Sequence, residues 1–364
     1  MSFKMPVYTA PDFSQQAYKD MPNACWIPAP ANGVAPDDYH ATTIFPEYFK
    51  INGSWQLARE SRMDCVAVLS RGVIEVKEFR RLKKGDLVAV GRSEDGSNGI
   101  YVHATAFTQP ESQGEESFAF RQGRSRETAY AMDYDSIYDL LRYEKEHGGH
   151  ITWVLGPACC FDWDARHAFA KLVHGGYVQA VLAGNALATH DLEAGYRSTA
   201  LGQDIYTQIS QPGGHYNHID TINQVRKAGS IEKFVAEQNI QDGIMAACVQ
   251  CKVPYVLTGS IRDDGPLPEV YADVYEGQNA MRDQVKKSTT VICLATTLHS
   301  IATGNMTPSY RVLADGTVRP VYFYSVDVSE FAVNKLRDRG SLAVKTIVTN
   351  VQDFIVNVQR GLSL

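Results

Sequence analysis

Six short apolar runs in the C-terminal two-thirds of the chain constrain its fold more than any other feature. Helix-like segments separate them, at 134–147, 162–174, 217–228 and 268–286. Continuous apolar strands that alternate with helices predict a parallel sheet covered on both faces, because each such strand is buried on both sides. The sequence therefore predicts an α/β domain over residues 121–364. Its strands are expected at 151–155, 178–183, 254–257, 290–295, 321–326 and 343–348.

The N-terminal third has a different pattern. Residues 1–45 are rich in Pro, Ala, Asn and Asp and show little periodicity, which predicts an irregular arm. Short apolar or alternating runs follow, with Gly-centred turns between them, and this spacing is typical of a small antiparallel β domain. The polar segment 108–126 marks the boundary, so we expect a smaller, mostly β domain over residues 1–120. Its strands are expected at 48–51, 65–69, 73–76, 87–90 and 100–102.

Charge and composition exclude several functional classes. The 364-residue chain has a net charge of -6 and a pI near 5.9, whereas a nucleic-acid-binding protein usually carries a basic stripe. No segment reaches the roughly 18 apolar residues of a membrane helix, and the N-terminus lacks the apolar region of a signal peptide. We therefore predict a cytoplasmic protein with neither a nucleic-acid nor a membrane partner. Seven Cys, an odd number, favour reduced thiols, and the lone Cys248–Cys251 pair predicts no metal site.

Small and polar residues follow almost every predicted strand of the α/β domain. The carboxyl ends of parallel strands share one edge of a sheet, where ligands of open α/β folds bind. Small residues let the backbone approach a phosphate, and a helix N-terminus beyond them offers free N–H groups, so we predict a nucleotide cofactor. The chain has no GxGxxG, GxxxxGK, HExxH or GxSxG motif. Asp327 after the fifth strand suits an adenosine ribose or, alternatively, the N-cap of a helix at 328–338.

The loop Thr258–Pro268, TGSIRDDGPLP, passes abruptly from apolar to charged residues. Two adjacent carboxylates beside a guanidinium need a ligand or water, so this loop is a candidate site; the alternative is a solvated loop with an internal ion pair. Histidines at 190, 215, 218 and 299 are also candidates, because His is a suitable base near neutral pH. A single His is nevertheless more often structural.

Several long segments resemble one family. They are GPACCFDWDARHAF, GYVQAVLAGNALATHDLEA, GQDIY, GHYNHIDTINQVRKAGSI, LTGSIRDDGPLPEV and LHSIATGNM, joined by FPEYFKINGSWQLARESRMDC and KKGDLVAVG nearer the N-terminus. Together they resemble the archaeal-type ornithine cyclodeaminase family, or LOR/SDH bifunctional-enzyme conserved region, over roughly residues 45–360. The nucleotide domain of that family is similar to that of deoxyhypusine synthase, a Rossmann-like parallel sheet that binds NAD without GxGxxG. Members also resemble the C-terminal half of fused cyanobacterial arginine-catabolic enzymes.

The resemblance implies conversion of L-ornithine to L-proline and ammonia with catalytic NAD. Hydride leaves Cα, the δ-amine attacks the resulting imine, ammonia departs and the same hydride reduces the cyclic imine. It also implies a role in proline biosynthesis and arginine catabolism, and a homo-oligomer. The expected cofactor-binding residues are Gly156, Pro157, Gly184, Asn185, Ala186, Asp191, Thr258, Gly259, Ser260, Thr296, Ser300, Gly304, Asn305, Met306, Asp327 and Val328.

Such a cycle needs groups that move protons and a cation that holds the substrate carboxylate. Asp263 and Asp264 are the candidate proton-transfer carboxylates, and the guanidinium of Arg262 is the candidate clamp. The second-rank catalytic candidates are His215, Asn217 and His299. Arg62 and Asp64 of the β domain are expected to close the substrate end of the cleft.

Two other functions stay open at the level of sequence. One is an NAD-linked cyclodeaminase or imine reductase for a different diamino or guanidino acid, because one methylene changes specificity by only about 1–3 kcal/mol. Cys159 and Cys160 lie near the expected cleft entrance, where a change in the shape of the cleft would change the substrate. The other is a non-catalytic NAD-binding protein, against which the density of polar groups at one edge argues.

Overall fold

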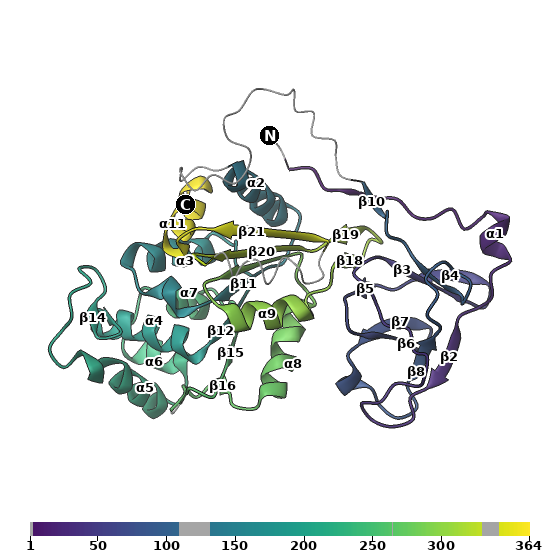
Figure 1. The fold of residues 1–364 in the computed structure, drawn as a ribbon. Coiled ribbons are helices and arrows are strands. Elements are labelled where there is room, and N and C mark those ends of the chain that lie inside the picture. The colour runs from purple at the N-terminus through teal and green to yellow at the C-terminus, as the bar shows by residue number, and fades with distance from the viewer. Residues whose placement is uncertain (1–2, 109–131, 264, 330–341) are drawn as a thin grey trace.

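The computed structural model describes residues 3–108, 132–263, 265–329 and 342–364, and it separates a β-rich N-terminal region from a larger α/β region (Figure 1). The α/β region is built on a seven-stranded parallel sheet in the order β16-β15-β12-β11-β17-β20-β21, which confirms the predicted fold class. All six predicted strands are present, and β16 is a short addition at one edge. The strands are β11 (Ile151–Leu155), β12 (Ala180–Gly184), β15 (Tyr255–Thr258), β16 (Val270–Tyr271), β17 (Thr290–Leu294), β20 (Tyr322–Asp327) and β21 (Ala343–Val348).

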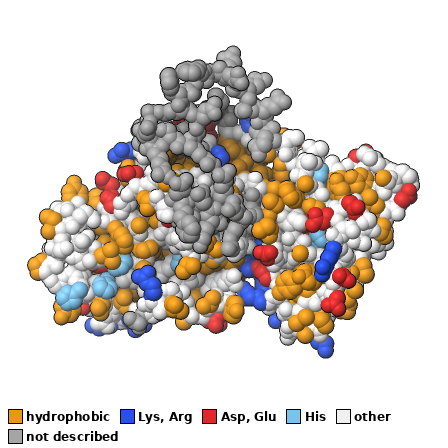
Figure 2. All heavy atoms as spheres, in the orientation of Figure 1, with side chains coloured by type: hydrophobic (Ala, Val, Ile, Leu, Met, Phe, Trp, Pro, Cys, Tyr) orange, Lys and Arg blue, Asp and Glu red, His pale blue; other side chains and the backbone are white. Residues whose placement is uncertain are grey.

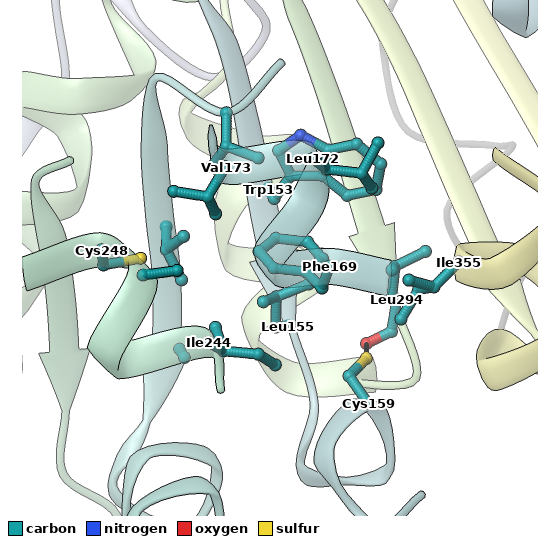
Figure 3. Close-up of a cluster of buried hydrophobic side chains, with 14 of the residues drawn as sticks. Trp153, Leu155, Cys159, Phe169, Leu172, Val173, Ile244, Cys248, Leu294 and Ile355 are labelled. Atoms are coloured by element: carbon teal, nitrogen blue, oxygen red, sulfur yellow. Dashed lines mark hydrogen bonds between the residues drawn. The ribbon is translucent and has the colours of Figure 1, made fainter. Parts of the chain in front are cut away.

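Helices cover both faces of this sheet. Successive residues of a strand point to opposite faces, and both sets of side chains are apolar in these strands. Val154, Leu182 and Val291 pack on one face under α8 (Val274–Val285) and α9 (Thr297–Met306). On the other face, Trp153, Leu155 and Leu294 pack against α3 and α11 (Figure 3). The remaining helices are α2 (Met132–Glu146), α3 (Trp163–His174), α4 (Asn185–Arg197), α5 (Asn217–Ala228), α6 (Ile231–Glu237), α7 (Ile244–Gln250) and α11 (Val351–Gly361), with 3-10 turns η1 (Phe79–Arg81), η2 (Pro157–Cys160) and η3 (Gly214–Tyr216).

The order in which successive strands are added to the sheet reverses between β11 and β17. From β11 it moves outward to β12 and β15, and it then returns to place β17 on the other side of β11. In an open α/β sheet this switch point leaves a crevice at the carboxyl ends of the two central strands. The topology therefore locates a ligand site independently of any motif.

The N-terminal region consists of antiparallel sheets, as predicted, in the orders β2-β8-β6-β7 and β4-β3-β9. The segment predicted as an irregular arm also contains three short regular elements, of which β1 pairs with β10 and β2 pairs with β8. The largely exposed residues of β2 gave no alternating pattern. These elements are β1 (Val7–Tyr8), α1 (Gln16–Lys19), β2 (Cys25–Pro28), β3 (Glu47–Ile51), β4 (Ser54–Leu57), β6 (Val66–Ser70), β7 (Val73–Lys77), β8 (Leu87–Val90), β9 (Ile100–Val102) and β10 (Phe107–Thr108).

A small antiparallel sheet joins the two regions. β5 (Glu60–Ser61) pairs with β18 (Tyr310–Val312), which pairs with β19 (Val318–Pro320) directly before β20. The N-terminal strands thus contact the amino end of the central sheet, and the arrows of β20 and β21 point away from them (Figure 1). The predicted domain boundary near residue 120 lies outside the described residues. Two further short strands are β13 (Thr199–Ala200) and β14 (Gln203–Asp204).

No helix in the described ranges combines the length and the apolar character needed to cross a membrane.

Candidate active site

The first part of the site is the switch point itself. Gly156 directly follows β11, and its N–H donates to the carbonyl of Leu294 over 2.8 Å. A Cβ at this position would lie 1.9 Å from the carbonyl oxygen of Ala295, so no larger residue fits between the two strand ends. The small residue predicted here is therefore required by the close approach of two backbones.

Two helices that begin at this edge have open N-termini. The N-cap residues of α4 and α9, Gly184 and Thr296, make no side-chain hydrogen bond to the first helical turn. By contrast, Asp162, Asp273 and Asn350 cap α3, α8 and α11 through their side chains. Uncapped N–H groups and the positive end of the helix dipole favour an anion. These two helix ends, together with Gly156, fit the diphosphate of a nucleotide cofactor.

The loop from Thr258 to Pro268 is fixed at both ends. Asp263 Oδ2 accepts a hydrogen bond from the Ser260 N–H over 2.8 Å, and Asn185 Oδ1 accepts one from the Leu267 N–H over 3.0 Å. The side chain of Arg262 is exposed, and no ion pair joins it to Asp263 in the described part of the chain. Arg262 and Asp263 therefore do not form the internal ion pair of the alternative interpretation. Asp264 lies outside the described residues, so its candidate role stays a prediction.

His299 joins the loop to α9. It lies in the first turn of that helix, and its Nε2 is 3.0 Å from Thr258 Oγ1 at the end of β15. Burial lowers the pKa of His299, and the carboxylate of Asp263 opposes this shift. A lowered pKa keeps the imidazole neutral near pH 7, so the ring serves as a hydrogen-bonding group at the strand ends.

A cavity of about 650 Å³ lies between α4, α5 and this loop. Histidine side chains gather on the surface over α4 and α5 (Figure 2). The cavity contains both acidic and basic groups, which suits a ligand with charges of both signs. Its lining residues are Asn185, Ala186, Thr189, His190, His218, Ile219, Asp220, Ile222, Asn223, Arg226, Arg262, Asp263 and Gly265.

Of the two second-rank candidates around residue 216, neither lines the cavity. His215 is exposed and lies against Tyr216, with ring centroids 4.2 Å apart. Asn217 donates to Thr199 Oγ1 over 3.0 Å, and Thr199 in turn donates to the buried carboxylate of Glu193. Sequence reasoning missed Glu193, although its spacing of three residues from His190 on a helix was a readable signal.

Two predicted cofactor ligands have structural contacts instead. Asp191 is 1% exposed, pairs with Arg166 over 2.8 Å and accepts hydrogen bonds from the N–H groups of Ile244 and Met245. It thereby caps α7, and its buried contacts favour a structural role over the predicted cofactor contact. Ser300 is a buried residue of α9, and its side chain hydrogen-bonds to the Cys293 thiol of β17.

The structure separates Arg62 and Asp64 from the strand-end cleft. Arg62 Nη1 donates to the carbonyl of Met306 at the C-terminal end of α9, over 3.0 Å. Nine residues of helix, about 13 Å at the helical rise, separate that end from Thr297 at the cleft. Arg62 and Asp64 therefore do not close the cleft within one chain, and Gly304, Asn305 and Met306 lie with them in a separate cavity of about 140 Å³. The direction of α9 thus places these five residues away from the strand-end cleft of the same chain, and their predicted roles stay predictions.

Asp327 and Val328 lie at the end of β20, and their predicted cofactor contacts stay predictions. Asp327 ends β20, and its Oδ1 accepts a hydrogen bond from the Ser329 N–H over 2.8 Å; most of the helix expected at 328–338 lies outside the described residues. Val328 is exposed beside it.

The cysteines predicted near the cleft entrance belong to the core. Cys159 and Cys160 are fully buried, and burial raises the pKa of Cys159 to about 12, which makes it an inert packing group. Cys248 is buried in α7, whereas Cys251 is exposed and lies 3.1 Å from His174 Nδ1. Within the described ranges, no group of three or more His, Cys, Asp or Glu residues could hold a metal ion.

Comparison with known proteins assigns this geometry to one group of enzymes. A family model described as the C-terminal Rossmann fold of arginine dihydrolase ArgZ-like proteins matches residues 135–358. The ornithine cyclodeaminase of Methanocaldococcus jannaschii is 38% identical over 338 residues, which is 90% of this chain and 75% of that protein. A LOR/SDH protein from Methanococcus maripaludis has a structure with TM-score 0.82 and 36% identity, over 94% of this chain and 99% of that one.

A further solved structure contains ligands. AgrE, whose Nostoc form is a bifunctional arginine dihydrolase/ornithine cyclodeaminase, was solved as a ternary complex with ornithine and NAD+. It matches 94% of this chain and 46% of its own, with TM-score 0.60 and 32% identity.

Proposed function

Because this chain belongs to the archaeal-type ornithine cyclodeaminase family, we propose that it converts L-ornithine to L-proline and ammonia with bound NAD. The observation that carries the proposal is the family match over 90% of the chain, combined with a ligand cleft at the carboxyl edge of the sheet. The ternary complex of AgrE with ornithine and NAD+ supports the same pair of ligands. When bound, NAD accepts the hydride from Cα of the substrate and later returns it to the cyclic imine.

The open ends of α4 and α9 and the backbone at Gly156 would hold the cofactor diphosphate, because they offer N–H groups and no side chain. Thr258 and His299 would fix the position of the cofactor relative to the loop 258–268. Asp327 would hydrogen-bond a ribose hydroxyl through its remaining carboxylate capacity.

The charged loop and α5 would bind the substrate. Arg262 would hold the α-carboxylate through two parallel hydrogen bonds, and Asp263 would face an amine nitrogen. Both residues line the same cavity, so a diamino acid can contact them together. Exclusion of water from this cavity would protect the imine from hydrolysis.

The test is a panel of diamino and guanidino acids incubated with NAD and the purified protein. We expect ammonia and proline from ornithine in equal amounts, with only a catalytic quantity of NAD. Turnover of a different acid alone would assign another substrate. Tight NAD binding without turnover of any acid would instead support a non-catalytic NAD-binding protein.

Three finer statements belong to this proposal. Ornithine turnover would place the chain in proline biosynthesis and arginine catabolism, and family resemblance supports a homo-oligomer. A cytoplasmic location is a further part of the proposal, which localisation of the tagged protein tests. Light scattering of the purified protein tests the oligomer, since a monomeric mass contradicts it.

A further inference from the structure

We propose that His190 transfers protons to and from the nitrogens of the diamino acid, and that Glu193 is the positioning residue that holds its imidazole. This inference rests on the proposed function and adds a residue and a substrate pocket to it. The two residues lie one turn apart on α4, the helix that begins at the end of β12. His190 lines the 650 Å³ cavity, whereas Glu193 lies in the protein interior.

The carboxylate of Glu193 is completely buried and fully used. It accepts hydrogen bonds from Thr199 Oγ1 over 2.8 Å, from the Gly202 N–H over 3.1 Å and from the Leu201 N–H over 3.2 Å. Its Oε2 also lies 2.9 Å from His190 Nδ1. A buried carboxylate that must accept all four bonds fixes the proton on Nδ1, which leaves the lone pair of Nε2 for the cavity.

The imidazole of His190 is held from both sides as well. Phe161 lies at 5.6 Å and His218 at 5.9 Å between ring centroids. The ring is only 12% exposed, although it borders a large cavity. His190 therefore combines a fixed orientation with access to a ligand, which is the geometry that a proton-transfer group needs.

The other charged groups around the cavity match a zwitterionic diamino acid. Asp220 of α5 and Asp263 of the loop offer carboxylates to ammonium groups, and Arg226 and Arg262 offer guanidinium groups to a carboxylate. His218 of α5 is the second titratable ring that faces His190. The pocket that His190 lines thus carries charges of both signs, which complement those of the substrate.

Other histidines at this edge are less suited to the step. His299 Nε2 is bound to Thr258, and His215 lies outside the cavity. Among the described residues, no carboxylate forms an ion pair with His218, so its ring orientation is not fixed in the same way.

The proton transfers balance across cyclisation. The neutral imidazole accepts a proton from the δ-ammonium, which frees that nitrogen to attack Cα of the imine, and the imidazolium donates the proton to the α-nitrogen. The attacking δ-nitrogen, now bonded to Cα, loses one proton to the neutral imidazole and so regains its lone pair. That lone pair forms the cyclic C=N bond as the Cα–N bond to the α-nitrogen breaks, and the electron pair of the broken bond leaves with ammonia. The imidazolium then gives its proton to ammonia, which departs as ammonium.

The main test compares His190→Gln with wild type and with the matched control His147→Gln, an exposed histidine directly after α2. We expect kcat/KM for ornithine to fall about 100-fold or more in His190→Gln, with loss of the acid limb of the pH profile. NAD affinity by calorimetry and the melting temperature should stay at wild-type values. A His190→Gln enzyme with wild-type kcat/KM and an unchanged acid limb would overturn the proposal.

Glu193→Gln separates positioning from catalysis. We expect its acid limb to move to lower pH, because the negative charge that stabilises the imidazolium is gone. A purely structural Glu193 would lower the melting temperature and leave the acid limb unchanged, and that result would overturn the positioning role.

A readout without turnover distinguishes this inference from the proposed function. In protein labelled with 15N-histidine, ornithine or another diamino acid should shift a ring resonance that is absent from His190→Gln. A shift in a protein that does not turn over ornithine would support the pocket and contradict the proposed reaction. Ornithine turnover without any shift of that resonance would support the reaction and overturn the role of His190.

Discussion

The amino and carboxyl edges of the seven-stranded sheet differ in whether their polar groups have hydrogen-bond partners within the chain. At the amino edge, Glu144 is completely buried, and both of its oxygens accept hydrogen bonds from Arg319, over 3.0 and 2.6 Å, while Thr290 donates a third. At the carboxyl edge, the first turns of α4 and α9 have no side-chain cap, and Arg262 is exposed. Polar groups that are satisfied within the chain hold the fold together, whereas polar groups that are left open await a ligand.

Charged groups are also paired within the chain at the junction between the central sheet and the N-terminal strands. Glu78 forms ion pairs with both Arg62 and Arg282, whose side chains are almost completely buried. Burial lowers the pKa of Arg282 to about 10, and repulsion from Arg62 adds to this shift. The shared carboxylate offsets part of that repulsion and joins β7, α8 and α9.

The largest expected effect is on stability at the amino edge. Glu144→Ala leaves the Arg319 guanidinium buried and unpaired, which should lower the free energy of unfolding by about 3–5 kcal/mol. Urea denaturation measures this change. Ornithine turnover per folded molecule should stay at the wild-type value, and a selective loss of turnover would break the division between the two edges.

The next effect is on substrate binding at the carboxyl edge. Arg262→Ala should weaken ornithine binding by about 1.5–3 kcal/mol, because a charged hydrogen-bond partner of the carboxylate is lost. The KM for ornithine should rise about 10- to 100-fold, with an unchanged melting temperature. Arg92→Ala, another exposed arginine, is the control, and equal kinetics of the two variants would remove Arg262 from the site.

Acid stability tests the amino edge again. Burial lowers the pKa of His150 to about 4, with repulsion from Lys287 and Arg311. The unfolded chain, with a His pKa near 6.5, then binds more protons than the folded one, so stability falls as pH drops from about 6.5 toward 4. The loss is about 1–2 kcal/mol once partial exposure is considered. His150→Gln should flatten this part of the stability curve, and an identical slope in both proteins would refute the assignment.

The smallest expected effect concerns Thr296, where a side-chain cap would change both stability and cofactor binding. Thr296→Asp adds the missing cap to α9, which should raise the free energy of unfolding without ligand by about 0.5–1 kcal/mol. The same carboxylate would repel the cofactor diphosphate, so NAD affinity should fall about tenfold. Calorimetry measures both quantities, and unchanged NAD affinity would show that this helix end is not part of the cofactor site.

The sequence was sufficient for the sheet because the strands of a two-faced parallel sheet are continuous apolar runs. It also located the carboxyl edge, since small and polar residues follow those runs. It was insufficient where a role depends on direction in space: Arg62 and Met306 meet at the far end of a helix whose first turn is at the cleft. Asp191 looked like a ligand because it adjoins His190, but on a helix it is Glu193, three residues away, that faces the same side.

The most direct test of the central claim follows one hydrogen atom. Ornithine deuterated at Cα, incubated with the NAD-loaded protein, should give proline that retains deuterium at C2, because the cofactor returns the hydride that it removed within one closed cleft. Mass spectrometry and NMR of the product measure this retention. Proline without deuterium, or ammonia released without proline, would contradict the account.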